Sequence, residues 1–289
     1  MLWKEHYKIG VETIDRQHQE LFQITESLLT AVTQGAGAAV YEQSLAFLTR
    51  YVVEHFRDEE AYQSAIHYSG LPLHREDHAQ FTRAIHAYAQ RWEDSGHDPA
   101  VMKNLSGMTT AWLIYHVISA DRNIVAPAAP AAETPHYDRC VEVFAASALD
   151  VLGMMAGLDR SQMQIHSATP YIPTGALYIT IELVGDRPGT AVFAFSRAFA
   201  LQLVCAMTMM EMQELDGIVQ SALCEIANIC CGNGTTTLAA MGIACDIRPP
   251  VVSETLDCDH NGVGLHLDTP MGWLEIALLM ADTRQQLLP

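Results

Sequence analysis

The sequence has few positive charges. Its 289 residues carry 16 lysines and arginines against 34 aspartates and glutamates, and no lysine follows Lys103. The formal net charge is −18, and the acidic excess is larger after residue 128 than before it. Such a surface repels the phosphates of DNA and RNA. We therefore expect no nucleic-acid partner.

The sequence also lacks the marks of export and of membrane insertion. It has no run of about 18 apolar residues, the length that a membrane-spanning helix needs. Its first residues, Met1-Leu2-Trp3-Lys4-Glu5-His6, contain no apolar signal core. The seven cysteines are odd in number, irregularly spaced and without a C-x-x-C pair, which favours a reducing compartment. We expect a cytoplasmic protein with no membrane span.

A short segment rich in proline and alanine divides the chain. Residues 126–135 read Ala-Pro-Ala-Ala-Pro-Ala-Ala-Glu-Thr-Pro, with three prolines and no large apolar side chain. Such a composition is typical of a semi-extended spacer. The length favours about two domains, and a hydrophobic content of 49% is enough for packed cores. The sequence predicts domains at 1–125 and 136–289, joined by a linker at 126–135.

The first part has the apolar periodicity of long helices. Apolar residues recur at spacings of three and four, and glycine or proline separates the periodic segments. The predicted helices run over about 12–33, 40–68, 72–92 and 99–123. Short connections between long helices imply antiparallel neighbours. The sequence therefore predicts an all-α, up-down four-helix bundle.

Two pairs of potential metal ligands lie on these predicted helices. His55 and Glu59 are four residues apart on the second helix, and His74 and His78 are four apart on the third. On an α-helix, residues i and i+4 lie on one face. Imidazole and carboxylate together suit iron, zinc, nickel or copper. A solvated acid–histidine pair is the alternative for either pair alone.

Each predicted helix contributes at least one donor, and the full set is His18, His55, Glu59, His74, His78, His116 and Asp121. Burying five imidazoles and two carboxylates together would be costly without a cation. Suppose that two octahedral metals share both carboxylates and one bridging oxygen. The metal with three histidines then has six donors and is full. The metal with two histidines has five donors and one vacant position. Asp121 is five residues after His116, about 140° away on an ideal helix, so it needs a loosened final turn.

These residues stand in motifs that resemble bacterial hemerythrins. The resemblance covers roughly the first 125 residues and all seven ligand positions of that family. The matching segments are Leu2-Trp3, Tyr7-Lys8-Ile9-Gly10-Val11, Ile14-Asp15-Arg16-Gln17-His18-Gln19-Glu20-Leu21-Phe22, His55-Phe56 with Glu59-Glu60, His74-x3-His78 and Trp112-Leu113-x2-His116-x4-Asp121.

The resemblance implies two non-haem iron ions, Fe2+ or Fe3+, with a bridging oxo or hydroxo group and O2 as ligand. One iron would be held by His74, His78 and His116, and the other by His18 and His55. Glu59 and Asp121 would bridge them, and O2 would bind at the iron with two histidines. NO and peroxide stay open as alternatives to O2.

Four neighbours of these ligands have simpler interpretations. Asp58 and Glu60 are expected to be solvated. Gln17 fits a packing or capping role as well as a contact with a ligand. Trp112 fits a wall of the ligand pocket as well as ordinary core packing.

The second part predicts an α+β domain with an antiparallel sheet and helices on one side. Residues 138–158 have a helical apolar face formed by Val141, Phe144, Ala145, Ala148, Leu149, Leu152 and Met155. Two further helices are predicted at 196–210 and at about 211–231. Strand-like runs cover 164–168, 175–184, 190–195, 247–254, 262–268 and 273–281.

The helix predicted after Glu211 places two polar residues together. Glu225 and Asn228 are three residues apart and face away from the row of apolar residues on this helix. We therefore expect them on an exposed face. Gly232 keeps the next turn bare. Residues 232–237, Gly-Asn-Gly-Thr-Thr-Thr, continue a helix poorly. Either the helix bends there or packing overrides propensity.

This helix resembles the CheX-like branch of the CheC/CheX/FliY chemotaxis phosphatases, with a likeness over most of 138–281. The matching residues are Leu215-Asp216, Ser221-Ala222-Leu223-Cys224-Glu225-Ile226-Ala227-Asn228-Ile229, Gly232 and Ile247-x-Pro249-Pro250-Val251-Val252. The resemblance implies that Asn228 orients a water in line with the aspartyl phosphate of a phosphorylated CheY-like response regulator, while Glu225 contacts the regulator's lysine. It also implies one site per chain and a homodimer through this domain.

Together the two parts predict an O2 or redox sensor that regulates dephosphorylation of a CheY-like regulator in chemotaxis or two-component signalling. The chain would then be an aspartyl-phosphate phosphatase. One alternative is a non-enzymatic O2-binding module tethered to a domain that docks a regulator without hydrolysing its phosphate. A second alternative is a protein for O2 storage or delivery.

Overall fold

The computed structural model describes residues 2–125, 138–171, 175–256 and 262–280. The expected linker at 126–135 lies outside these ranges. The chain divides into two compact units, one built mainly from residues up to 128 and the other mainly from residues after it. No helix in the described part of the chain is both long and apolar enough to cross a membrane.

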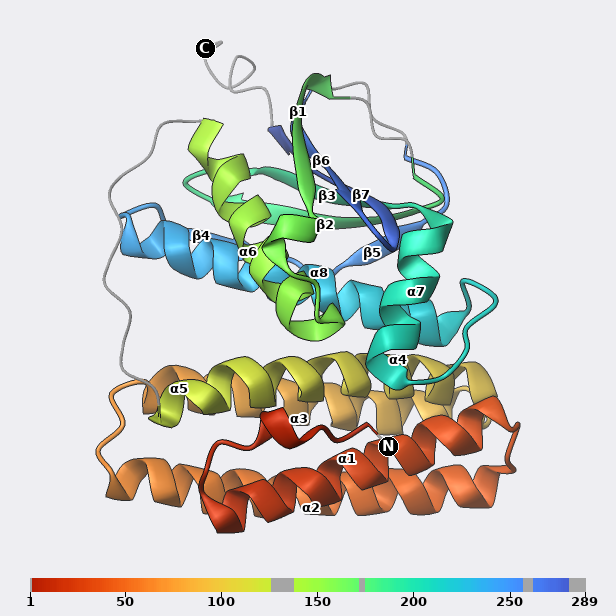
Figure 1. The fold of residues 1–289 in the computed structure, drawn as a ribbon. Coiled ribbons are helices and arrows are strands. Elements are labelled where there is room, and N and C mark those ends of the chain that lie inside the picture. Colours follow the sequence, from red (N-terminus) through yellow and green to blue (C-terminus); the bar gives the residue numbers. More distant parts are fainter. Residues whose placement is uncertain (1, 126–137, 172–174, 257–261, 281–289) are drawn as a thin grey trace, which may run out of the picture. The chain divides into compact units, whose positions relative to one another are not determined.

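The first unit is a four-helix bundle (Figure 1), as predicted. A 3-10 turn, η1 (Glu5–Tyr7), precedes the bundle helices, and α4 continues into a π-helical turn, η2, and a short helix, α5. Helices α1 and α3 each pack against both α2 and α4. The bounds are α1 (Glu12–Thr33), α2 (Ala38–Ala65), α3 (Leu71–Asp94), α4 (Pro99–Tyr115), η2 (His116–Asp121) and α5 (Arg122–Val125).

Local sequence signals set the ends of these helices. Asp98 caps α4, because its side chain accepts a hydrogen bond of 2.9 Å from the amide of Ala100. Asp15, in the first turn of α1, accepts from the amides of Ile9 and Gly10 at 2.8 and 3.0 Å. These contacts fix the entering chain against the bundle.

The second unit is an α+β domain, also as predicted. Its seven described strands form one antiparallel sheet in the order β1-β6-β7-β3-β2-β4, and β5 also pairs with β2. The strands are β1 (Gln164–Tyr171), β2 (Leu177–Gly185), β3 (Gly189–Phe195), β4 (Cys245–Ile247), β5 (Val251–Ser253), β6 (Gly262–Thr269) and β7 (Gly272–Met280). The helical elements are α6 (Asp138–Ala156), η3 (Arg160–Gln162), α7 (Arg197–Thr208) and α8 (Gly217–Ala240).

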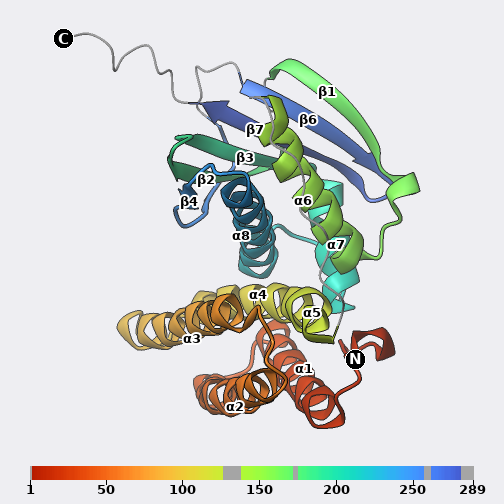
Figure 2. The same ribbon diagram turned by 90° about the vertical axis from the view of Figure 1, so that its left-hand side faces the viewer.

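Helices α6 and α8 lie on the same side of the sheet (Figure 2). All seven apolar residues of the face predicted for 138–158 are buried, and α6 packs on β6 and β7. The prediction of one continuous strand over 247–254 is wrong, because the chain forms two short strands there, β4 and β5. Pro249 and Pro250 lie between them, and proline has no amide proton for a ladder hydrogen bond.

Helix α8 differs from its predicted bounds. It begins at Gly217 rather than near Glu211, and it runs on past Gly232 to Ala240. Packing overrides the poor helix propensity of 232–237. A Cβ atom at Gly234 would lie 2.5 Å from the Phe144 ring of α6, so only glycine allows this close approach. One turn later, Leu238 is 1% exposed.

Candidate metal centre and regulator-docking helix

The seven predicted ligands lie inside the helical bundle. None of them is more than 4% exposed. They come from α1 (His18), α2 (His55 and Glu59), α3 (His74 and His78) and the turn η2 (His116 and Asp121). The structure therefore brings together every residue of the predicted set.

The donor atoms form two groups that share one carboxylate. Glu59, His74, His78 and His116 can place one atom each within 4.8 Å of one another, and so can His18, His55 and Glu59. The Oε1 atom of Glu59 lies 2.6 Å from His74 Nε2. Its Oε2 atom lies 3.2 Å from His55 Nε2. One carboxylate therefore faces a three-histidine group with one oxygen and a two-histidine group with the other.

Asp121 is the second carboxylate that contacts both groups. Its Oδ1 atom lies 3.1 Å from His116 Nε2 and 3.4 Å from His74 Nε2. Its Oδ2 atom lies 3.1 Å from His18 Nε2. Glu59 and Asp121 thus have equivalent places between the two sets of histidines.

The local backbone explains how Asp121 reaches the interior. Residues His116–Asp121 form a π-helical turn between α4 and α5. A π-helix pairs residue i with residue i+5, and such turns inside α-helices are frequent at functional sites. His116 and Asp121 are the first and last residues of this turn, and both are buried. The loosened final turn that the sequence required is confirmed, and its form is a π-helix.

Polar neighbours hold two of the imidazoles by their Nδ1 atoms. His55 Nδ1 lies 3.2 Å from Gln17 Oε1, and the Gln17 amide donates to Asp58 at 2.9 Å. His78 Nδ1 lies 3.0 Å from Glu60 Oε1. A carboxylate oxygen accepts hydrogen bonds, so this contact favours the tautomer of His78 with its proton on Nδ1. The Nε2 lone pair of His78 is then free to bind a metal.

These contacts decide the roles of three residues that the sequence left open or misplaced. The expectation that Glu60 is solvated is wrong, because Glu60 is half-buried between His78 and Arg75, whose Nε donates to it at 3.0 Å. Asp58 is likewise half-buried. Gln17 contacts a ligand. Sequence spacing could not show this, because Gln17 and Glu60 contact residues of other helices.

The electrostatics of the group favour ionised carboxylates. Burial alone would raise the pKa of Glu59, but the imidazoles of His18, His55 and His74 beside it hold it well below its ordinary value. Burial and the charge of Glu59 would raise the pKa of Asp121, yet His116 and His18 keep it low. Two negative charges are therefore held inside the bundle, where a cation would be strongly stabilised.

The donor group fits a metal because several of its polar atoms, although close to one another, are not directed so as to form hydrogen bonds among the described residues. These buried atoms include Glu59 Oε2, both oxygens of Asp121, and Nε2 of His18 and His74. In addition, Nε2 of His78 lies 3.0 Å from Nε2 of His116. Buried polar atoms are normally satisfied, so this many exceptions at one point call for a ligand. Nitrogen and oxygen donors of these types suit iron.

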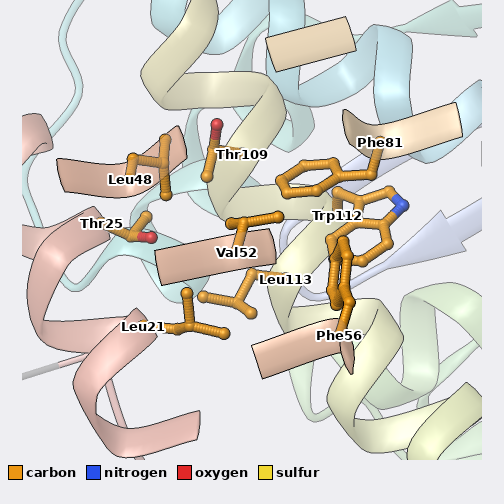
Figure 3. A pocket seen from close by; sticks show the side chains of 9 residues that line it. All are labelled: Leu21, Thr25, Leu48, Val52, Phe56, Phe81, Thr109, Trp112 and Leu113. Carbon is orange, nitrogen blue, oxygen red and sulfur yellow. The ribbon is translucent and has the colours of Figure 1, made fainter. Parts of the chain in front are cut away.

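An apolar cavity adjoins the ligands (Figure 3). Its volume is about 10 Å³, and all four bundle helices contribute to it. Phe56 stacks on His78 with ring centroids 3.7 Å apart, and Trp112 stacks on His116 at 4.2 Å. Both aromatic residues also line the cavity. Trp112, which is half-buried, therefore stacks on a predicted ligand and lines the cavity as well.

The pair predicted on the second unit lies one turn apart on α8. Glu225 and Asn228 are half-buried rather than fully exposed. Burial raises the pKa of Glu225 to about 7, and the side chain of Asn228 opposes that rise. A Cβ atom at Gly232, in the next turn, would meet no described atom within 4 Å. The polar pair and the bare turn thus lie in succession along one helix.

Comparison with known proteins assigns the two units. Residues 9–128 match the family model "Hemerythrin HHE cation binding domain", and residues 177–261 match "Chemotaxis phosphatase CheX". A bacteriohemerythrin of Clostridium acetobutylicum is 24% identical over 127 residues, which cover 43% of this chain and 98% of that protein. The CheY-P phosphatase CheX of Thermotoga maritima is 30% identical over 123 residues, 42% of this chain and 77% of that protein. A CheX structure from Vibrio vulnificus has 24% identity and a TM-score of 0.44, covering 50% of this chain and 99% of that one.

The fold, the donor group and these matches define a class of protein. In this class, a hemerythrin-type bundle precedes a chemotaxis-type α+β domain. The chain belongs to the CheX family and carries a hemerythrin HHE domain in front of its CheX domain.

Proposed function

We propose that this chain is an O2 or redox sensor that controls dephosphorylation of a CheY-like response regulator. The observation that carries the proposal is the buried donor group, divided into three and two histidines around shared carboxylates. It stands on the same chain as a CheX domain with the Glu225–Asn228 pair. We also infer a hemerythrin domain over 1–125, a CheX domain over 136–289, and a cytoplasmic protein that dimerises through the CheX domain.

In this proposal the bundle holds two non-haem iron ions. His74, His78 and His116 would bind one, His18 and His55 the other, and Glu59 and Asp121 both. The iron pair would supply reversible binding and reduction of O2. The protein's part is to exclude water: the ligands are buried, and Phe56 and Trp112 cover His78 and His116 with apolar rings.

The CheX domain would supply the output. Asn228 would orient a water molecule in line with the regulator's aspartyl phosphate, and Glu225 would contact a regulator lysine. The water oxygen bonds to phosphorus, the bond from phosphorus to the aspartate oxygen breaks, and inorganic phosphate and a free carboxylate result. Positioning of the water is enough to accelerate such a reaction. The positions of Glu225 and Asn228 three residues apart on α8 support these roles, because one partner can contact both side chains.

Control of the output requires that the metal state changes the affinity or rate of the CheX domain. An effector can do so only through differential binding to two states of the protein. The test is the decay of a phosphorylated CheY-like regulator in the presence of iron-loaded protein. It is measured once in the deoxygenated di-ferrous state and once with O2, with the state checked by absorption spectra. Different decay rates would establish the sensor, whereas equal rates would contradict the control.

A docking domain without phosphatase activity is the second candidate, and the half-buried position of Glu225 and Asn228 favours it, since partial cover limits access of water. The Asn228→Ala variant separates the candidates. Loss of regulator dephosphorylation with intact regulator binding supports the phosphatase. If the wild-type protein binds the regulator but leaves the phosphate decay unchanged, docking alone is the function. O2 storage or delivery would remain if the regulator does not bind.

A further inference from the structure

Gln63 is a buried polar residue beside the metal ligands that neither the motif nor the seven-residue donor set includes. It lies on α2, one turn after Glu59, and it is 0% exposed. Its amide nitrogen donates a hydrogen bond of 2.5 Å to Glu59 Oε1. That is the oxygen which faces the three-histidine group, 2.6 Å from His74 Nε2.

The chemistry of the pair determines the direction of the Gln63 amide. Glu59 Oε1 is the acceptor of the hydrogen bond from the Gln63 amide nitrogen, and the carbonyl oxygen of an amide cannot donate. The NH2 group of Gln63 must therefore face Glu59, and its carbonyl oxygen must face away. That carbonyl oxygen is buried and has no hydrogen-bond partner among the described residues. An unpaired buried acceptor is unfavourable, so packing alone does not explain a glutamine here.

A second glutamine makes the same type of side-chain contact away from the metal ligands. On α3, Gln90 donates to Asp94 at 2.8 Å, also four residues along the helix, but this pair is exposed to solvent. Water competes for every group of the exposed pair. The buried pair has no such competition, so its hydrogen bond acts fully on the carboxylate.

We propose that Gln63 is a positioning residue for Glu59, which holds the carboxylate in its bridging orientation and sets the redox balance of the metal pair. The proposal rests on iron binding as proposed above. The hydrogen bond occupies one lone pair of Oε1 and directs Oε2 toward the two-histidine group. It also withdraws electron density from the carboxylate. A weaker donor stabilises the higher oxidation state less, so Gln63 favours reduced iron.

The test replaces Gln63 with methionine, which has a similar length and shape but no donor. Gln90→Met, which removes the exposed pair, is the matched control. Three quantities are measured: thermal unfolding of the metal-free protein, iron bound per chain, and the ratio of reduced to oxidised iron at a fixed ambient potential. Gln63→Met should leave the metal-free protein as stable as the wild type or more so. The ratio of reduced to oxidised iron should fall roughly tenfold. Gln90→Met should change neither.

A purely structural role of Gln63 would not lower the ratio of reduced to oxidised iron while leaving the stability of the metal-free protein intact. If Gln63→Met binds iron with an unchanged ratio, the inference is wrong while the proposed iron site stands. If the wild-type protein binds no iron, the proposed function fails and the inference with it. Gln63→Leu, which also lacks a donor, must shift the ratio in the same direction. An opposite shift would overturn the proposal even if Gln63→Met does not fold.

Discussion

The two candidate sites of this chain differ in how completely the chain builds them. The donor group in the bundle draws on all four long helices or their continuations, and every ligand is buried. The pair on α8 consists of two half-buried side chains of a single helix. In the proposed functions, the first site needs only a metal, whereas the second needs a phosphate that a partner brings.

Because of this difference, the two sites should be sensitive to different substitutions. In the bundle, a ligand is oriented by further side chains, such as Glu60 on His78 and Gln17 on His55. A change one contact away from the ligands should therefore still affect the metal. On α8, the proposed docking should depend on the bare turn at Gly232 as well as on the polar pair, because a docking partner needs an unobstructed surface.

The largest effect should come from the carboxylate that both donor groups share. Glu59→Gln keeps the size of the side chain but removes the charge that pairs with His18, His55 and His74. We expect iron affinity to fall by more than about 100-fold, since loss of a mere neighbour of a ligand costs about 10- to 100-fold. Iron content per chain after dialysis is the measurement.

The control for that change is Glu54→Gln, on the exposed side of the same helix. It should bind iron like the wild type. Full iron content in the Glu59→Gln protein would contradict the shared-carboxylate assignment.

On α8, Asn228→Ala should abolish most of the acceleration of regulator dephosphorylation. We expect a rate lower by about 100-fold, the scale on which mispositioning a reactant acts. Iron binding should be unchanged, because the residue lies in the other unit. The measurement is the decay of phosphorylated regulator with excess protein. Asn233→Ala, at the other asparagine of α8, should retain the rate, and equal loss in both variants would mean general damage to the helix.

A substitution beside a ligand tests whether neighbouring side chains orient the ligands of the bundle. Glu60→Gln replaces the carboxylate that accepts from His78 Nδ1 at 3.0 Å. The neutral amide orients His78 less strongly, so iron affinity should fall about 10-fold. Competition with a chelator measures the affinity. Glu76→Gln, at an exposed acid of α3, is the control, and an effect of equal size there would point to net charge instead of His78.

Two glycines of α8 should respond in opposite directions. Gly234→Ala places a methyl group 2.5 Å from the Phe144 ring, and the overpacking should lower the free energy of unfolding by about 1–3 kcal/mol. Gly232→Ala meets no described atom within 4 Å, and it should raise that free energy by up to about 1 kcal/mol through helix propensity. Chemical denaturation measures both.

The same pair of variants sharpens the comparison between the two sites. Gly232→Ala should weaken binding of the regulator although it stabilises the fold, because its methyl group lies on the proposed docking surface. Titration of the regulator would show this. Unchanged affinity would mean that the surface around Gly232 is not used.

Much of the bundle could be predicted because its signals are local and repeated. The bounds of α1 agree with the sequence to the residue, and donors four residues apart on α2 and α3 point to a common face. Asp121 was the difficult ligand, since its spacing from His116 fits no α-helix. Sequence could state the requirement for a loosened turn but not that a π-helix meets it.

Other features depend on contacts between distant segments. The sequence disfavoured a helix over 232–237, yet α8 continues there because Gly234 packs on Phe144 of α6. Glu60 looked solvated because its partner, His78, lies on another helix. Nothing in the local sequence around Gln63 shows that this residue is buried against Glu59.

The sequence by itself predicted a two-part chain, the seven donors that the structure brings together and the polar pair of α8. Spacing along a helix and the chemistry of side chains are properties of short segments, and they survive without knowledge of the fold. Only the tertiary structure decided which acids and amides orient the ligands, how Asp121 enters the interior and where α8 ends. Those outcomes follow from burial and from contacts across helices, and both exist only once the chain has packed.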